Sequence, residues 1–233
     1  MRLDRFLAET TELTRSLAKK ALQRGEVTLN GVVTKQAATK VGEDDRVEWD
    51  GKPLALVGLR YVMLHKPTEV ECSARRGLYP RAVDLIELPK AERLQTVGRL
   101  DVDTTGLVLL TDDGQWAHRV TSPRRRCAKV YRATLAEPLT GDALRAAIAR
   151  FEEGLLLDGE EKPTLPAELV MRSDRDAELT LYEGRYHQVK RMFAAIGNHV
   201  TALHRESVGP LTLGSLGPGQ WRELRPDEVA AFD

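Results

Sequence analysis

The stretch GRLDVDTTGL, residues 98–107, brings together the residue types that could carry out chemistry. Asp101 and Asp103 are separated by one residue and lie between Arg99 and a pair of threonines. Two carboxylates at this spacing could bind a metal ion together. Alternatively, one carboxylate reacts as a nucleophile or a general base while the other shapes the turn.

The metal-binding interpretation corresponds to the Asp-x-Asp loop of haloacid-dehalogenase-like phosphatases, in which both carboxylates flank Mg²⁺. That loop follows a buried apolar strand in an alternating β/α chain, whereas the apolar run GLVLLTD, residues 106–112, comes after the aspartates here. A zinc site is disfavoured as well, because His187, His199 and His204 are irregularly spaced and the cysteines are remote. We therefore expect no metal.

The surroundings of the two aspartates differ. Asp103 and Thr104 are typical of a turn, where short polar side chains cap backbone amides. Asp101 follows an apolar residue, so an ionised carboxylate at this position needs a cation beside it. The helical pattern HQVKRMFAAIG places Lys190 and Arg191 beside apolar residues, and one of the two is expected to point inward toward an acidic partner.

Basic residues gather at the start of the chain, although 35 acidic residues balance 35 Lys and Arg overall. Thr14 is a candidate N-cap for a helix that ends at Gly25, with Leu17, Ala18, Ala21 and Leu22 on one face. The other face of this helix and the helix before it carry the cations Arg15, Lys19, Lys20, Arg24, Arg2 and Arg5. A phosphate backbone would stabilise such uncompensated charges, so the pattern predicts binding to RNA or DNA.

A second basic region spans residues 114–136, which contain six Lys or Arg and no acid. Its arginines at 124–126 form either a solvated loop or a phosphate-binding edge. Cys127 lies among these cations, which could depress the pKa of its thiol. Tyr131 lies in an alternating strand, where its ring either packs within the sheet or stacks on a nucleobase.

The element pattern changes near Gly58, and the expected domains are residues 1–57 and 60–233. The first contains a helix at 2–9, the helix at 15–24, a hairpin around Asn30-Gly31 and a further strand ending near residue 51. From residue 60 onward, short strands outnumber helices without regular βαβ alternation. This predicts an α+β fold with a mainly antiparallel mixed sheet.

Several classes of protein are disfavoured by composition. Cys72 and Cys127 are far apart and form no CxxC pair, as expected in a reducing compartment. No apolar run reaches membrane-spanning length, and the first residues lack the apolar segment of a signal peptide. We expect a cytoplasmic protein.

These motifs together resemble the RsuA family of pseudouridine synthases along the whole chain. The stretch TRSLAKKALQRGEVTLNGVVT is similar to the S4 RNA-binding module. The other matching motifs are HKP (65–67), GRLDVDTTGLVLLTDDG (98–114), KVYRATL (129–135), GRYHQVKRMFAAIGNHV (184–200) and LHRE (203–206). Within the family, the chain is most similar to members that modify 16S ribosomal RNA.

The resemblance implies roles for individual residues. Asp101 would be the catalytic carboxylate, Tyr131 the active-site tyrosine, and Lys190 the basic residue that pairs with the aspartate. Related synthases often have Arg in place of this lysine, so the partner is kept but its fork geometry is not. The implied substrate-binding residues are Leu203, which would line the uracil pocket, Arg99, and the S4-like cations Arg2, Arg5, Arg15, Lys19, Lys20 and Arg24.

The implied reaction converts a uridine of 16S ribosomal RNA, expected to be uridine 516, to pseudouridine without a metal or cofactor. The N1–C1′ bond breaks and C5 joins C1′ in a uridine flipped out of the RNA. The carboxylate could attack C1′ or the uracil ring, or remove the 2′ proton. We expect a monomer that acts on a small-subunit assembly intermediate. The alternatives are a large-subunit enzyme of the same family and a non-catalytic S4-type RNA-binding or ribosome-assembly protein.

Overall fold

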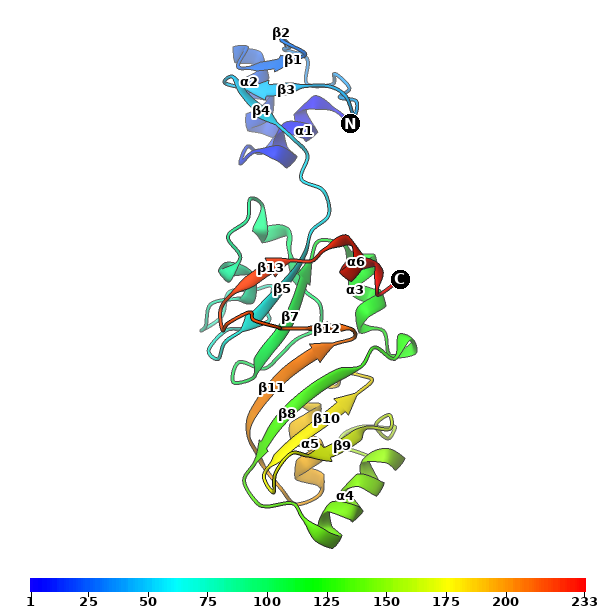
Figure 1. The fold of residues 1–233 in the computed structure, drawn as a ribbon. Helices are drawn as coiled ribbons and strands as arrows, with labels where there is room; N and C mark the ends of the chain where they lie inside the picture. Colours follow the sequence, from blue (N-terminus) through cyan, green and yellow to red (C-terminus); the bar gives the residue numbers. More distant parts are fainter. The chain divides into compact units, whose positions relative to one another are not determined.

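Two compact units, Met1–Gly58 and Leu59–Asp233, make up the chain in a computed structural model that describes residues 1–233. Each unit has a sheet and a hydrophobic core of its own (Figure 1). None of the helices combines the length and the apolarity needed to cross a bilayer.

The N-terminal unit packs two helices against an antiparallel sheet of order β2-β1-β3-β4. The Thr14 side chain accepts a hydrogen bond from the Leu17 amide at the start of α2, and Gly25 ends this helix in the left-handed conformation. Both features and the Asn30-Gly31 hairpin confirm the sequence prediction. The elements are α1 (Leu3–Thr10), α2 (Arg15–Arg24), β1 (Val27–Leu29), β2 (Val32–Val33), β3 (Val47–Trp49) and β4 (Lys52–Leu54).

Leu17 does not belong to the buried face of α2, so this part of the prediction is wrong. Ala18, Ala21 and Leu22 are buried, whereas Leu17 is 43% exposed. The three buried residues follow the spacing i, i+3, i+4 that aligns side chains on one helix face. Leu17 precedes this set by one residue, which turns its side chain about 100° away from the face.

The C-terminal unit is built on a nine-stranded mixed sheet. Its main path is β13-β5-β7-β11-β8-β10-β9, with β12 paired to β11 and β6 paired to β7. Among these strand pairs only β7–β11 is parallel, which confirms the expected α+β class with a mainly antiparallel sheet. The strands are β5 (Tyr61–Lys66), β6 (Gln95–Thr96), β7 (Thr105–Thr111), β8 (Lys129–Leu135), β9 (Glu168–Met171), β10 (Asp176–Leu181), β11 (Val200–Val208), β12 (Leu211–Thr212) and β13 (Trp221–Glu223).

Helices pack against this sheet in two groups (Figure 1). Helices α4 (Gly141–Glu153) and α5 (Gln188–Ala195) contribute to the larger core, and α3 (Gly114–Thr121) and the region of α6 (Pro226–Ala230) to a second core. Helix α3 was not expected from the sequence pattern. Asp113 caps it by accepting hydrogen bonds from two backbone amides.

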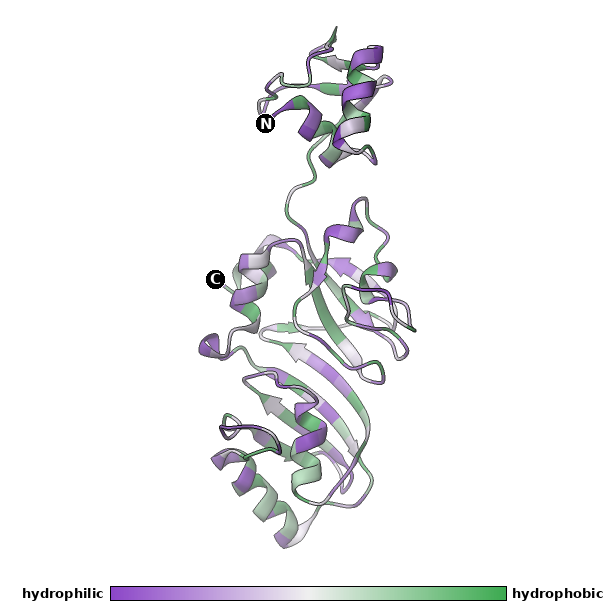
Figure 2. Cartoon of the chain, turned by 180° about the vertical axis from the view of Figure 1, so that it is seen from behind, coloured by the Kyte–Doolittle hydropathy of each residue, from purple (hydrophilic) through white to green (hydrophobic).

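Strands β5 and β7 are buried on both faces. In β7, Val108 and Leu110 enter the larger core, whereas Leu107 and Leu109 enter the second core with α3. This two-sided burial explains why both strands are continuous apolar runs in the sequence, and Figure 2 shows them mainly in the hydrophobic colour. Strand β8 alternates instead, with Tyr131 buried and Arg132 exposed.

Gly106 is required where the parallel pair begins. It has φ +116°, a conformation that residues with a Cβ rarely adopt, and it lies opposite Arg205 of β11. A Cβ at this position would overlap the Arg205 backbone. The glycine therefore lets β7 and β11 approach each other directly after the two aspartates.

Replacing Gly106 with Ala is expected to lower the free energy of unfolding by more than about 2 kcal/mol, because backbone strain adds to the clash with β11. Thermal denaturation of the full chain, followed by circular dichroism, measures this loss. Gly114→Ala is the matched control, since a Cβ there meets nothing within 4 Å at the start of α3. Equal melting temperatures for the two variants would contradict the argument.

Candidate active site at the start of strand β7

Asp101 lies in a backbone turn that leads into β7. The Thr104 amide donates a hydrogen bond to the Asp101 carbonyl oxygen at 3.0 Å and closes the turn. The carbonyl oxygen of Val102 accepts hydrogen bonds from the Glu69 amide at 2.9 Å and from Lys66 Nζ at 3.3 Å. The turn is thus fixed through its main chain, and its carboxylates are free to face other groups.

Lys66 is a buried cation that holds this turn from the end of β5. Its ammonium group also donates to the carbonyl oxygens of Pro67 and Val70, both at 2.8 Å, and has no carboxylate partner. Burial lowers the pKa of Lys66, while the charges of Cys72, Asp103 and Asp101 oppose this shift. The lysine of the HKP motif therefore connects the sheet to the segment that carries Asp101.

Helix α5 brings a second lysine to the carboxylates. Lys190 Nζ donates to Asp101 Oδ2 at 3.0 Å, to Asp103 Oδ1 at 2.8 Å and to Asp103 Oδ2 at 3.0 Å. Burial alone would lower the pKa of Lys190, but the hydrogen bonds to Asp103 and Asp101 outweigh it and raise this pKa. The structure thus brings Asp101 and Lys190 together from sites 89 residues apart.

Asp103, which was expected to shape the turn, also binds Lys190. Its carboxylate shares the ammonium group of Lys190 with Asp101, and this hydrogen bond lowers the pKa of Asp103. The two acids differ in exposure, because the Asp103 side chain is 72% exposed and that of Asp101 only 28%. No group of three or more acidic, His or Cys side chains is arranged to hold a metal ion.

His187 contacts the other oxygen of the same carboxylate, which the sequence analysis did not anticipate. Its Nε2 lies 3.2 Å from Asp101 Oδ1. A hydrogen bond to the carboxylate requires a proton on Nε2, so we assign Nε2 as the donor. Helical spacing does not predict this contact, because His187 precedes the first residue of α5 and adopts the left-handed conformation. Asp101 therefore lies between two basic groups, each next to a different oxygen.

Tyr131 and Leu203 lie on neighbouring strands and belong to the larger core. Leu203 pairs with Ala133 across β11 and β8, and Tyr131 pairs with Arg205. The same core contains Leu100 and Val189, the chain neighbours of Asp101 and Lys190. Tyr131 and Leu203 thus border the same packed region as the ion pair, although no hydrogen bond joins Tyr131 to Asp101.

Arg205 holds the phenol of Tyr131 in place. Its Nη1 donates to Tyr131 Oη at 3.4 Å, its guanidinium lies 5.9 Å from the ring centroid, and its Nε donates to the Leu107 carbonyl oxygen at 2.8 Å. Arg205 is buried and has no carboxylate partner. By contrast, Arg99 is exposed and forms no ion pair.

The expectation for Cys127 is wrong in sign. Burial raises the pKa of its thiol, and the charges of Lys129 and Arg205 only partly offset the effect. Among the neighbouring arginines, the guanidinium of Arg126 lies 5.4 Å from the ring centroid of Tyr182. Cys127 is therefore a packing residue and not an activated nucleophile.

The cations of the N-terminal unit are exposed. The sequence predicted that acids would not compensate their charges, but most of them form ion pairs. Their acidic partners lie in the same unit, outside the basic face of α2. The ion pairs are Arg2–Asp4 at 3.0 Å, Arg5–Glu9 at 2.7 Å, Arg15–Asp4 at 3.7 Å and Arg24–Glu26 at 3.3 Å. Lys19 and Lys20 form no such pair, so they are the cations of α2 that are free to bind a phosphate. Arg2, Arg5 and Arg15 also line a shared surface hollow.

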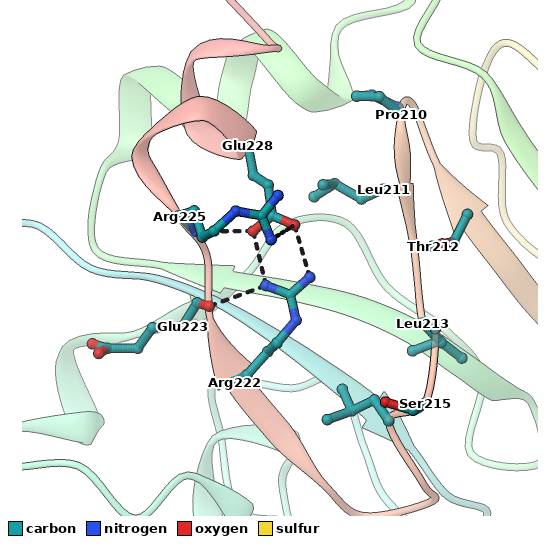
Figure 3. Close-up of a pocket in the computed structure, with 11 residues that line it drawn as sticks. Pro210, Leu211, Thr212, Leu213, Ser215, Arg222, Glu223, Arg225 and Glu228 are labelled. Carbon is teal, nitrogen blue, oxygen red and sulfur yellow. Dashed lines mark hydrogen bonds and ion pairs between the residues drawn. The ribbon is translucent and has the colours of Figure 1, made fainter.

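A separate hollow of about 560 Å³ lies beside β12 and α6 (Figure 3). Its polar side is an ion pair in which both terminal nitrogens of Arg222 donate to Glu228 at 2.8 Å. Arg225 also contacts this carboxylate, while Glu223 points away from it. None of the residues around the Asp101 carboxylate lines this hollow, so it is distinct from the candidate site.

Comparison with known proteins identifies both units. Residues 60–195 match the RNA pseudouridylate synthase family and residues 1–47 the S4 domain. Proteins named ribosomal small subunit pseudouridine synthase A are 49% identical in Vibrio cholerae, covering 100% of this chain and 99% of that protein, and 45% identical in Escherichia coli K12, covering 99% of each. A solved structure described as a pseudouridylate synthase superposes with a TM-score of 0.69 at 44% identity and covers 100% of both chains.

The acid dependence of folding tests the ion pair beside the separate hollow. The hydrogen bond from Arg222 lowers the pKa of Glu228 from 4.5 to about 2, so its stabilising effect is complete above pH 4.5 and is lost as the pH falls toward 2. We expect Glu228→Gln to be less stable than the unsubstituted chain at neutral pH and the difference to shrink across this window. Urea denaturation at several pH values measures it, with the exposed Glu223→Gln as control. A difference that is independent of pH would contradict the assignment.

Proposed function

The chain belongs to the RNA pseudouridylate synthase family, and we propose that it converts one uridine of small-subunit ribosomal RNA to pseudouridine. The observation that carries the proposal is the Asp101 carboxylate held between Lys190 and His187. Relatives named for the small subunit match the whole chain, which supports 16S RNA, with uridine 516 as the proposed site. We further propose that the protein acts in the cytoplasm as a monomer on an assembly intermediate.

Asp101 is the reacting carboxylate in this proposal. The isomerisation breaks N1–C1′ and forms C5–C1′, so it needs a group that attacks C1′ or the uracil ring, or that removes the 2′ proton. Lys190 keeps a positive charge beside Oδ2, and His187 donates toward Oδ1. Because both oxygens are held, the carboxylate meets the ribose in one orientation.

Tyr131 and Leu203 form the apolar side of the site. Their side chains border the core next to Leu100, so a uracil ring entering beside Asp101 would pack against them. Packing of this kind excludes water, which would otherwise divert the reaction toward hydrolysis of the glycosidic bond. Arg205 fixes the tyrosine hydroxyl as a hydrogen-bond acceptor and leaves its proton for the substrate.

The remaining predicted contacts are to the RNA backbone. Arg99 is exposed two residues before Asp101 and has no acidic partner, so it is available for a phosphate near the target uridine. Lys19 and Lys20 on α2 supply sequence-independent affinity. The uridine must leave its stack before its C1′ can meet the carboxylate.

Two alternatives make different predictions. A large-subunit enzyme of the same family would modify 23S and not 16S RNA, and the full-length small-subunit relatives argue against it. A non-catalytic S4-type RNA-binding or ribosome-assembly protein would bind RNA and leave every uridine unchanged. Mapping pseudouridine in 16S RNA from cells with and without this protein separates both from the proposal.

Asp101→Asn is expected to lower the rate of pseudouridine formation by at least about 10³-fold while it leaves RNA affinity nearly unchanged, because the amide keeps the shape but cannot react. Single-turnover release of tritium from C5-labelled 16S RNA measures the rate, and filter binding measures affinity. Asp103→Asn is the control: it loses only an exposed ion pair, so its rate should fall less than about tenfold. Full activity in Asp101→Asn would refute the assignment.

Removing the two unpaired lysines of α2 should weaken RNA binding in a salt-dependent manner. For Lys19→Gln/Lys20→Gln, the slope of log affinity against log salt concentration should become shallower by roughly 1.4 to 1.8, since each phosphate contact contributes about 0.7 to 0.9. Binding isotherms at four salt concentrations test this. Lys52→Gln, which removes an exposed lysine on β4, should leave the slope unchanged. An equal effect of both variants would show that α2 has no special role.

A further inference from the structure

Tyr186 is an exposed aromatic residue beside the candidate site. Its side chain is 71% exposed, although it lies in the turn that leads into α5, one residue before His187. None of the roles proposed above involves Tyr186. An aromatic ring that remains in water forgoes the stabilisation that burial would provide, so its position requires an explanation.

The main chain around Tyr186 is fixed by several contacts. Arg191 Nη1 donates to the Tyr186 carbonyl oxygen at 3.0 Å, and the same side chain binds Glu160 at 2.9 Å and the Asp158 carbonyl oxygen at 2.7 Å. On the other side, Arg185 binds the Pro163 carbonyl oxygen at 2.6 Å. The turn is thus held to the segment 158–163, and the exposure of Tyr186 does not reflect a loose loop.

His187 connects the tyrosine ring to the reacting carboxylate. The two rings stack with centroids 3.7 Å apart and an interplanar angle of 21°. His187 adopts φ +46°, a conformation that costs free energy in a residue other than glycine and is retained where the surrounding structure enforces it. The same imidazole lies 3.2 Å from Asp101 Oδ1, so one face of Tyr186 is covered by a ring of the site and the other is open.

We propose that the open face of Tyr186 binds a nucleobase of the RNA, namely a base that flanks the target uridine. This inference rests on the proposed function. When a uridine leaves the stack, its neighbour loses a stacking partner and exposes one face. An aromatic ring next to the carboxylate can take the place of that partner, and the resulting stack would run from the base through Tyr186 and His187 to Asp101.

The proposal predicts the chemistry that this position tolerates. Base stacking depends on the ring and not on the hydroxyl, so Tyr186→Phe should bind RNA within about twofold of the tyrosine form, and Tyr186→Leu should lose about tenfold in affinity. Stacking is also tolerant of sequence, because every base has a π face. The contribution of Tyr186 to RNA affinity should therefore remain when the flanking base is changed to another base, and it should be lost when the base is removed.

The experiment measures RNA affinity in the full-length Asp101→Asn variant, which allows binding to be followed without turnover. Tyr186→Phe and Tyr186→Leu are introduced into this background and titrated with a fragment of 16S RNA that contains the proposed site. The same fragment is made with an abasic nucleotide at each position next to the target. At one of these positions, the abasic nucleotide and Tyr186→Leu should each lower RNA affinity, but their combined effect on the binding free energy should be smaller than the sum. The reason is that both changes remove the same contact.

Other outcomes overturn the proposal. If Tyr186→Leu binds as tightly as Tyr186→Phe, no base stacks on the ring. Tyr186→Leu is also made in the chain that retains Asp101. If this variant forms pseudouridine slowly but binds RNA normally, Tyr186 only orients His187. If the two losses add at every flanking position, the ring contacts something other than these bases. The proposed function is judged separately by pseudouridine formation in the unsubstituted chain, so failure of one does not imply failure of the other.

Discussion

The contact on which the site depends is the ion pair between Asp101 and Lys190, two residues that lie 89 positions apart. One belongs to the turn before β7 and the other to helix α5, so the pair forms only when the sheet and the helix are both in place. An ion pair at the surface contributes little to stability, and this one is only partly exposed and shared with Asp103 and His187. Its role is better understood as fixing the position and charge environment of one carboxylate.

Buried cations support the segment that carries this carboxylate. Lys66 binds the Val102 carbonyl oxygen just after Asp101, and Arg205 binds that of Leu107 at the beginning of β7. Neither has an acidic partner, so each cation is desolvated at a cost that carbonyl dipoles only partly offset. The benefit is that residues 102–107 are held at both ends. Gly106 completes the arrangement, because the absence of a Cβ lets β11 approach the same segment.

Affinity and chemistry draw on different parts of the chain. The N-terminal unit presents cations on a helix, and most of them are already paired with acids of the same unit. Such pairs limit the repulsion among like charges in the absence of RNA, and the two unpaired lysines remain for phosphate contacts. The C-terminal unit instead buries its cations and uses them to place a turn, a tyrosine and a carboxylate. Lysine and arginine therefore serve two purposes: exposed side chains provide RNA affinity, and buried side chains position the residues of the site.

The sequence by itself determined the features that depend on neighbouring residues: the Thr14 cap, the Asn30-Gly31 hairpin, the apolar strand after Asp101 and the α+β class. The resemblance to a known family pointed to Asp101 and Lys190 as partners. Only the tertiary structure decided that His187 contacts Asp101, that Asp103 shares Lys190, and that Lys66 and Arg205 support the site. The periodicity of apolar residues predicts which face of an element is buried. These contacts, however, join residues of separate elements that are distant in the sequence. Their geometry is set by how the strands and α5 pack, which no local pattern encodes.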